Sequence, residues 1–284
     1  MNLPKVNIKQ LLEAGVHLGH KTFRWNPKMD KFIFGAKNSI HIIDLVQTLE
    51  MTNAALIQIH KCIASGGKIL FVSTKKQATE AITSLAKDTS QFYVNHRWLG
   101  GMLTNWKTIS NSIKYYKKLS EDLKKENIGF TKKEILKMSA ERDKLERSLG
   151  GIADMKKIPE MIFIIDTNVE SLAVKEAIKL NIPIVAIVDS NSDPSGINFP
   201  IPGNDDARRA INLYCELVKA TVIDAQKNII TKDSAEIESK PQSHESQQNE
   251  KKQNSKMKEK KDTIIKKTTS ILSKIKTLTS KKLK

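Results

Sequence analysis

Cysteine is scarce in this chain of 284 residues, and the two that it has, Cys62 and Cys215, lie far apart. Neither belongs to a metal-type pair, so the sequence argues against a disulfide scaffold and a zinc-finger module and favours a reducing compartment. The first ten residues hold no apolar segment of the kind found in secretory signals. Because the longest apolar runs, such as Ile184 to Val188, are far too short to cross a bilayer, we expect a soluble intracellular protein without a membrane partner.

Nucleotide-binding loops are also missing. The sequence contains neither G-x-G-x-x-G nor G-x-x-x-x-G-K-[ST], and its glycine pairs stand isolated at 66–67, 100–101 and 150–151. No Ser–His–Asp or Cys–His set can be recognised by spacing, and the zinc-deaminase pattern is absent. We therefore expect no enzyme, although a nucleotide- or sugar-phosphate-dependent α/β enzyme stays open as an alternative at this point.

Acidic residues are too few to balance the basic ones, and the imbalance is uneven along the chain. There are 48 Lys and Arg against 31 Asp and Glu, a formal net charge of +17. Residues 1–158 hold 27 basic and 14 acidic residues, residues 159–230 hold six and ten, and residues 231–284 hold fifteen and seven. A polyanion should therefore meet the first part and the tail, whereas 159–230 should lie away from it or face a basic neighbour.

The apolar pattern predicts strands and helices in alternation. The strands are expected at 32–35, 40–44, 68–73, 91–94, 161–166, 183–189 and 199–202, and the helices at 7–16, 45–65, 75–87, 169–180 and 205–227. The strands from residue 68 onward are continuously apolar, which is typical of strands buried on both faces. This order predicts an α/β fold, a doubly wound, mostly parallel sheet with helices on both faces.

Two segments depart from this pattern. Residues 104–149 predict two polar, Lys-rich helices, 104–126 and 131–149, broken at 128–130, with a capping box from Thr131 to Glu134. We interpret them as an antiparallel hairpin inserted between body segments 1–103 and 150–230; an ordinary packed helix pair is the alternative. Residues 231–284 predict a disordered basic tail, within which 263–284 could form an amphipathic helix. A regulator that uses this tail on nucleic acid or anionic membrane is a further alternative.

RNA-binding character is concentrated in two runs that mix cations with aromatic residues, 17–31 and 95–106. Cations serve phosphates, and aromatic rings serve stacking or anchoring. In the second run we expect Trp98 and Trp106 to anchor the hairpin and Gly100-Gly101 to permit a sharp turn. Lysines after strand 68–73 could also meet a phosphate at a helix N-terminus. The predicted RNA contacts are Lys21, Arg24, Trp25, Lys28, Lys75, Lys76, His96, Arg97, Asn105 and Lys107.

Carboxylates gather after the predicted strands, where α/β enzymes place catalytic groups. Asp166 and Asp189 end two strands, and further aspartates follow in loops. With His17 or His20 they could hold Mg²⁺ or another divalent ion. The stronger reading is structural, because Asp193-Pro194 and Asn204-Asp205 are turn and N-cap signals. No cofactor is required, and a structural divalent ion is the option left open, with weak candidates His17, Asp189, Asp193 and Asp205.

Six stretches, spread in order from residue 6 to about 226, resemble one known family. They read G-V-H-L-G-H-K-T-F-R-W-N-P-K-M at 15–29, F-I-F-G-A-K-N at 32–38, F-Y-V-N-H-R-W-L-G-G-M-L-T-N-W-K-T at 92–108, L-G-G-I at 149–152, I-V-D-S-N-S-D-P at 187–194 and I-P-G-N-D-D-A at 201–207. The chain resembles the second protein of the small ribosomal subunit, in its bacterial or organellar type.

The resemblance implies a flavodoxin-like body with an inserted helical hairpin and no catalytic activity. It implies a place near the head–body junction of the small subunit, in a cytoplasmic or an organellar ribosome. The expected partners are small-subunit rRNA and neighbouring ribosomal proteins, including the mRNA-binding first protein, and no homo-oligomer is expected. Phe23 departs from the basic or polar aromatic residue expected there, which removes one phosphate contact. The basic tail also departs from many relatives, so its role is not implied.

Overall fold

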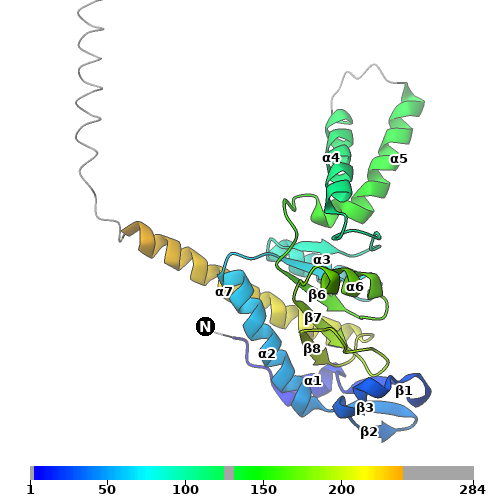
Figure 1. Ribbon diagram of the computed structural model, residues 1–284, viewed down its shortest axis with the longest axis vertical. Coiled ribbons are helices and arrows are strands. Elements are labelled where there is room, and N and C mark those ends of the chain that lie inside the picture. Colours follow the sequence, from blue (N-terminus) through cyan, green and yellow to red (C-terminus); the bar gives the residue numbers. More distant parts are fainter. Residues whose placement is uncertain (1–2, 125–130, 239–284) are drawn as a thin grey trace, which may run out of the picture. The chain divides into compact units, whose positions relative to one another are not determined.

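The structure is a computed structural model that describes residues 3–124 and 131–238. Residues up to Lys232 form one compact unit, and the chain from Asp233 onward is assigned to a second. In chain order the described residues begin with α1 (Ile8–Ala14), β1 (Leu18–Lys21), the short 3₁₀ helices η1 (Thr22–Arg24) and η2 (Pro27–Phe32), β2 (Ile33–Lys37), β3 (Ile40–Ile43) and α2 (Leu45–Ala64) (Figure 1). They continue with β4 (Ile69–Val72), α3 (Thr79–Asp88), β5 (Phe92–Val94), α4 (Trp106–Asp122), α5 (Lys132–Leu149), η3 (Gly150–Ile152), β6 (Met161–Ile165), α6 (Ser171–Lys179), β7 (Ile184–Val188), β8 (Phe199–Pro202) and α7 (Arg208–Glu238).

Five strands form the central sheet in the order β5-β4-β6-β7-β8, and each neighbouring pair is parallel. Counted from β4, this is the 2-1-3-4-5 order of flavodoxin-like folds. The predicted doubly wound α/β fold is confirmed. In such folds the strand order reverses at a switch point, here between β4 and β6, and ligands bind beyond the carboxyl ends of the strands near it.

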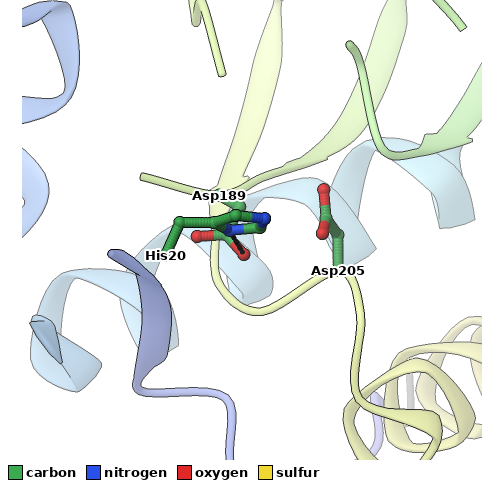
Figure 2. Close-up of side chains that lie close together, drawn as sticks. All are labelled: His20, Asp189 and Asp205. Atoms are coloured by element: carbon green, nitrogen blue, oxygen red, sulfur yellow. Dashed lines mark ion pairs between the residues drawn. The ribbon is translucent and has the colours of Figure 1, made fainter. Parts of the chain in front are cut away.

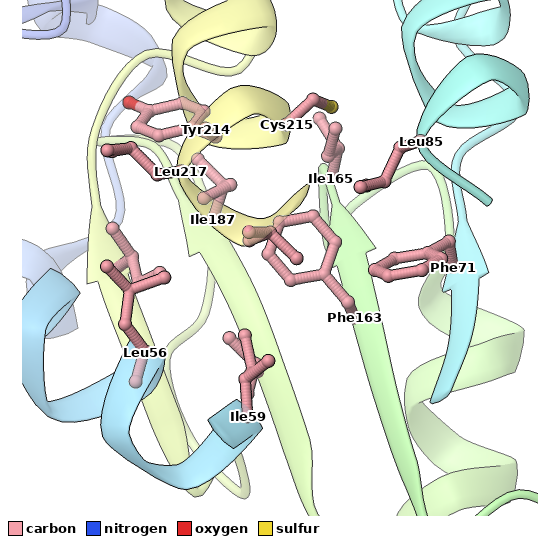
Figure 3. Close-up of a cluster of buried hydrophobic side chains, with 14 of the residues drawn as sticks. Leu56, Ile59, Phe71, Leu85, Phe163, Ile165, Ile187, Tyr214, Cys215 and Leu217 are labelled. Carbon is pink, nitrogen blue, oxygen red and sulfur yellow. The ribbon is translucent and has the colours of Figure 1, made fainter. Parts of the chain in front are cut away.

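Both faces of this sheet are buried, because successive side chains of a strand point to opposite sides. Phe71, Phe163 and Val185 lie on one face, in a cluster with side chains of α1, α2, α3 and α7. Figure 3 shows this cluster, in which the rings of Phe71 and Phe163 meet edge to face with centroids 5.8 Å apart. Leu70 and Ile162 lie on the other face with α6 and the base of α4. Burial on both faces accounts for the continuously apolar strands.

A second, three-stranded antiparallel sheet has the order β1-β3-β2. Its β2 and β3 match the two strands predicted at 32–35 and 40–44. No strand was predicted at β1, since residues 17–31 were interpreted as a basic binding loop. The four residues of β1 include a glycine and a lysine and are too few to show an alternating pattern, so pairing with β3 decides their conformation.

The predicted hairpin contains the helices α4 and α5, which lie side by side in Figure 1. The predicted capping box is confirmed: the Thr131 hydroxyl accepts from the Glu134 backbone N–H, and the Glu134 carboxylate accepts from the Thr131 backbone N–H. At the base of the pair, Ile109 and Leu149 are buried in the cluster under α6, whereas Leu136 is 70% exposed. The predicted break at 128–130 lies outside the described residues.

The last helix, α7, is longer than expected. It runs to Glu238, whereas the apolar pattern predicted an end at residue 227 and a disordered tail from 231. Residues 239–284, with the amphipathic helix expected at 263–284, lie outside the described residues. Within 3–124 and 131–238, none of the helices combines the length and the apolarity needed to span a membrane.

Candidate nucleic-acid interface

The segment from Asn95 to Trp106 links β5 to α4, and its apolar residues fix it to the body. Trp98 is 6% exposed, and Met102 and Leu103 are buried beside it in the cluster under α6. Trp106 packs partly buried against the same cluster. Gly101 adopts a positive φ of 81°, which side chains with a Cβ rarely adopt, so the turn uses a glycine here. The two tryptophans are therefore positioned as anchors rather than as free stacking surfaces.

One buried carboxylate on α6 also holds this segment. Glu176 is 9% exposed and accepts five hydrogen bonds of 2.8 to 3.1 Å, from the Trp98 Nε1–H, the backbone N–H groups of Gly101, Leu103 and Thr104, and the Thr104 hydroxyl. Burial alone would raise the pKa of Glu176, but these hydrogen bonds outweigh it and lower the pKa below the ordinary value. The carboxylate thus stays ionised and ties together loop donors that would otherwise be unpaired.

The polar residues of the same segment point the other way, into solvent. His96, Arg97 and Lys107 are exposed, and no hydrogen bond or ion pair joins their side chains to any part of the described chain. Asn105 is exposed as well, and its Oδ1 accepts from the Thr108 hydroxyl at 3.0 Å. A buried anchor with unpaired cations on its outer side is an arrangement suited to a polyanion.

The first predicted segment, 17–31, is divided among β1, η1 and η2. Lys21 and Arg24 are exposed, and the Arg24 guanidinium lies 5.5 Å from the centroid of the Phe23 ring. Phe23 is 73% exposed. Trp25 is 37% exposed, and its ring centroid lies 5.3 Å from that of His41. Trp25 is therefore partly an anchor on β3 and partly open.

Two of the predicted RNA contacts are already neutralised inside the protein. The Lys28 ammonium lies 2.7 Å from an Asp193 carboxylate oxygen and 3.0 Å from the Ser195 hydroxyl. The hydrogen bond from Lys28 lowers the pKa of Asp193 to about 2, and the backbone N–H of Ser195 acts in the same direction. Lys75 is more deeply engaged and is described next, whereas its neighbour Lys76 is exposed.

Lys75 sits at the carboxyl edge of the central sheet, next to the switch point. Residues 76–78 form a turn and α3 begins only at Thr79, so Lys75 is not the first residue of a helix, as the sequence had predicted. Its ammonium lies 2.7 Å from Asp166, 2.8 Å from Asp205 and 2.7 Å from Asp206, and its side chain is only 14% exposed. This placement does not support Lys75 as an RNA contact.

Three aspartates surround the single positive charge of Lys75, and the excess negative charge affects the pKa of Asp205. Burial, followed by the negative charges of Asp189 and Asp166, raises the pKa of Asp205 to about 7, although the charge of Lys75 opposes the rise. The Oδ2 atom of Asp205 is buried and accepts no hydrogen bond from the described residues, whereas the buried Oδ2 of Asp189 lies 3.0 Å from the His20 Nδ1. Carboxylate oxygens buried in this way call for a further positive partner.

His20 completes this cluster from β1, as Figure 2 shows. Its Nδ1 lies 3.0 Å from Asp189 and its Nε2 lies 3.3 Å from Asp206. The hydrogen bond to Asp189 raises the pKa of His20, while burial acts against the rise. One donor atom each from His20, Asp189 and Asp205 lie within 4.8 Å of one another. Of the other metal candidates, Asp193 pairs with Lys28, and His17 is not part of this group.

A glycine lets β1 approach the cluster so closely. A Cβ placed on Gly19 would lie 2.7 Å from the Ser190 hydroxyl and 3.2 Å from Asp189 Oδ1. With no side chain in the way, the adjacent backbone N–H of His20 donates to the Ser190 hydroxyl at 2.8 Å. This contact is the physical reason for a glycine at position 19.

Sequence reasoning missed Glu176, the residue with the most bonds to the predicted interface. The available signal was an acidic residue on the buried side of α6, between Ala173 and Ala177, which are both fully buried. An acidic residue on an apolar helix face is costly unless it is paired, so it indicates a partner nearby. The sequence could not show that this partner is a loop some 75 residues earlier.

Comparison with known proteins gives the chain its family. The family model described as Ribosomal protein S2 matches residues 11–225. The chain is 58% identical over 224 residues to the small ribosomal subunit protein uS2 of Parvibaculum lavamentivorans, covering 79% of this chain and 88% of that protein. It is 58% identical to the uS2 of Sinorhizobium medicae, with the same coverage, and 57% identical to that of Phenylobacterium zucineum, covering 79% of this chain and 76% of the relative. The resemblance seen in the sequence is confirmed, and the chain belongs to the ribosomal protein S2 family, in its bacterial type.

Proposed function

We propose that this protein is a structural constituent of the small ribosomal subunit, where it binds small-subunit rRNA and supports translation without catalysing a reaction. The observation that carries the proposal is the segment from Asn95 to Trp106. Its apolar side and Glu176 fix it to the body, while His96 and Arg97 stand exposed and unpaired within the described chain. Cations held on a fixed backbone are suited to phosphate contacts that set position and orientation on RNA.

The proposed RNA surface keeps most of the residues predicted from the sequence. It consists of Lys21, Arg24, Trp25, Lys76, His96, Arg97, Asn105 and Lys107. Lys75 is left out, because three aspartates already surround its ammonium. Lys28 has a lesser role, since its ion pair with Asp193 would have to be exchanged for a phosphate.

The finer assignments rest on the family and on charge. We propose that the protein acts as a single copy in the cytoplasmic ribosome, near the head–body junction. Its further partners would be neighbouring small-subunit proteins, including the mRNA-binding first protein. Residues 159–230, with six basic and ten acidic residues, are the part suited to a basic protein neighbour rather than to RNA.

The first test is binding to a small-subunit rRNA fragment across a salt series. Phosphate-driven binding should weaken linearly on a log–log plot as salt rises, with a slope set by the number of phosphates neutralised. A flat response would contradict the electrostatic interface. The second test asks whether the protein co-sediments with small subunits at high salt, and whether this survives deletion of residues 231–284. If association vanishes entirely with the tail, the body-centred interface is wrong.

We further propose that His20, Asp189 and Asp205 hold a structural divalent cation. An imidazole with two carboxylates is a donor set suited to Zn²⁺ and to related ions. The buried Oδ2 of Asp205, which accepts no hydrogen bond from the described residues, supports this fit. A bound cation would neutralise the excess negative charge around Lys75 and hold β1 to the central sheet.

The cation is tested by measuring metal content and thermal stability before and after chelation. His20→Ala should lower the metal content and remove the effect of chelator on the melting temperature. His17→Ala is the matched control and should leave both unchanged. Equal metal content in the wild type and in His20→Ala would contradict the site.

A further inference from the structure

A cavity of about 350 Å³ lies where the end of β5 meets the last turns of α5. It is lined by Tyr93, Asn95, His96, Asp143, Glu146, Arg147 and Gly151. The residues come from three places in the chain: β5 with the loop after it, α5, and η3. Its volume falls in the range of small-ligand sites in proteins. His96 thus belongs both to the proposed RNA surface and to a defined hollow beside it.

The walls of this cavity are held at a fixed separation. A Cβ placed on Gly151 would lie 2.0 Å from the Tyr93 carbonyl oxygen and 2.8 Å from the Tyr93 ring, so η3 packs directly on β5. Any side chain at position 151 would force the two walls apart. Directly after β5, the Asn95 Nδ2 donates to the Thr83 hydroxyl at 2.9 Å, which orients that amide. The hollow is therefore preformed in the fold rather than opened by a partner.

The charges that line the cavity are mixed, and only some are neutralised. Asp143 is bound by the Arg142 guanidinium, whose Nε lies 3.0 Å from its Oδ1. Arg147 and His96 are exposed, and within the described residues neither side chain has a hydrogen bond or an ion pair. The Glu146 carboxylate likewise accepts no hydrogen bond from that part of the chain. The cavity offers the Arg147 guanidinium and the His96 imidazole at its rim, and the Glu146 carboxylate, whose charge also acts on Arg142.

A ligand for this set must satisfy both signs of charge. A simple anion would be repelled by Glu146, and a simple cation by Arg147. A nucleotide within an RNA strand has the required combination, because its phosphates are anionic and its base carries hydrogen-bond donors. Unstacked bases of RNA pack on the planar side chains of His, Arg and Tyr and are read on their Watson–Crick edges.

Among the four bases, guanine fits the carboxylate best. It presents two adjacent donors, N1–H and N2–H, which two oxygens of one carboxylate can accept together. Adenine and cytosine offer only an amino group on that edge, and uracil offers one N–H between two carbonyl oxygens. We propose that this cavity binds one unstacked guanine of the RNA partner, with Glu146 reading its edge and His96 and Arg147 flanking its ring and phosphate. The proposal rests on the proposed function, since it names which nucleotide that RNA places beside His96.

The test uses labelled RNA heptamers of uridine that carry guanosine, inosine, adenosine or uridine at the centre. Fluorescence anisotropy with the full chain should show about tenfold tighter binding of the guanosine heptamer than of the adenosine or uridine heptamer. A bidentate pair with a base discriminates by about 1–3 kcal/mol, and tenfold corresponds to about 1.4 kcal/mol. Inosine lacks the N2 amino group and should fall between guanosine and uridine.

Two variants assign the preference to the cavity. Glu146→Gln should bring the guanosine heptamer to the affinity of the uridine heptamer, because the amide cannot accept both donors. Glu121→Gln makes the same change of charge on an exposed residue of α4 outside the cavity, and the preference should persist. Both residues are exposed, so the melting temperatures of both variants should match that of the wild type.

Three results would overturn the proposal: no heptamer binding, equal affinity for all four heptamers, or a guanosine preference that survives Glu146→Gln. Binding of the small-subunit rRNA fragment, measured in parallel, separates this failure from that of the proposed function. If the fragment binds with the expected salt dependence while the heptamers are not distinguished, only the guanine site is wrong. If the wild type does not bind the fragment, the proposed rRNA interface itself is wrong.

Discussion

Lys75 and Arg97 follow neighbouring parallel strands, β4 and β5, at the same edge of the sheet, yet they have opposite surroundings. Lys75 is enclosed by three aspartates, with only 14% of its side chain exposed. Arg97 is exposed and has no ion pair within the described residues. One cation is used to hold the fold together, and the other is left for a partner. The position of a basic residue after a strand therefore does not decide its role. Its role depends on whether later strands place carboxylates next to it.

The difference arises from the order of the strands. Asp166 follows β6, which pairs with β4, while Asp205 and Asp206 follow β8 and complete the cluster around Lys75. Arg97 follows β5, which is the edge strand. Its only neighbour in the sheet is β4, and within the described residues no carboxylate pairs with Arg97. The free cations thus lie at the edge of the sheet and on the segment that leads into α4.

The largest effect on stability is expected from removing Lys75. Lys75→Ala should lower the free energy of unfolding by about 3–5 kcal/mol at pH 8, because it leaves buried aspartates without their cation. Lys76→Ala, which removes an exposed cation next to it, should change stability by less than about 0.5 kcal/mol. Urea denaturation of both variants measures the difference. Equal stability of the two would mean that Lys75 is not a structural cation.

The next effect is a pH dependence at Asp205. Burial, with the charges of Asp189 and Asp166, raises the pKa of this carboxyl from 3.8 to about 7. The folded chain therefore binds the proton more tightly than the unfolded chain does. The stability contributed by protonation is full below about pH 3.8 and is lost as the pH rises through about 7.

Asp205→Asn cannot ionise, so in the presence of chelator it should gain stability relative to the wild type between about pH 4 and pH 8. The gain should not exceed about 4 kcal/mol, since one pKa unit is worth 1.36 kcal/mol. Asp193→Asn is the control of opposite sign, because Lys28 lowers the pKa of Asp193 to about 2. It should show no gain over this range. Parallel changes in the two variants would contradict the assignment.

A smaller loss of stability is expected from Glu176→Gln. The amide nitrogen would face backbone donors that now share the carboxylate, and at least one of them would be left unpaired, which costs about 2 kcal/mol. Because these donors belong to the segment that carries Arg97, affinity for the rRNA fragment should fall as well. Glu50→Gln removes an exposed carboxylate on α2 and should affect neither quantity. Retained affinity in Glu176→Gln would show that the segment does not depend on this anchor.

The fold was largely predictable, because it rests on local patterns. The continuous apolar runs at β4, β6 and β7 predicted buried parallel strands, and Thr131 with Glu134 predicted the start of α5. β1 was not predicted, since its strand conformation depends on pairing with β3 rather than on its own four residues. The end of α7 was also misplaced, because the polar residues after 227 carry no apolar pattern.

The candidate site was predictable in part. Exposure of Arg97 and Lys107 agrees with their sequence context, and Trp98 was expected to be an anchor. The pairing of Lys75 with Asp166 and Asp205 depends on residues 91 and 130 positions later, which only the strand order brings together. The same is true of Glu176 and of the cavity beside His96. Where the partner that neutralises a side chain lies far away in the sequence, neither the composition of the chain nor the local motif can identify the pair.

The mildest and most specific prediction compares Arg97 with a cation of the hairpin. Arg97→Ala should weaken binding of the small-subunit rRNA fragment by about 1 kcal/mol, roughly fivefold, and reduce the salt slope by about one. Lys124→Ala, just past the end of α4, should weaken it less, because no anchored segment holds that lysine in place. Neither variant should change the free energy of unfolding by more than about 0.5 kcal/mol, since both residues are exposed. Equal losses of affinity would mean that the interface depends on the total positive charge, and that the fixed segment from Asn95 to Trp106 has no special role.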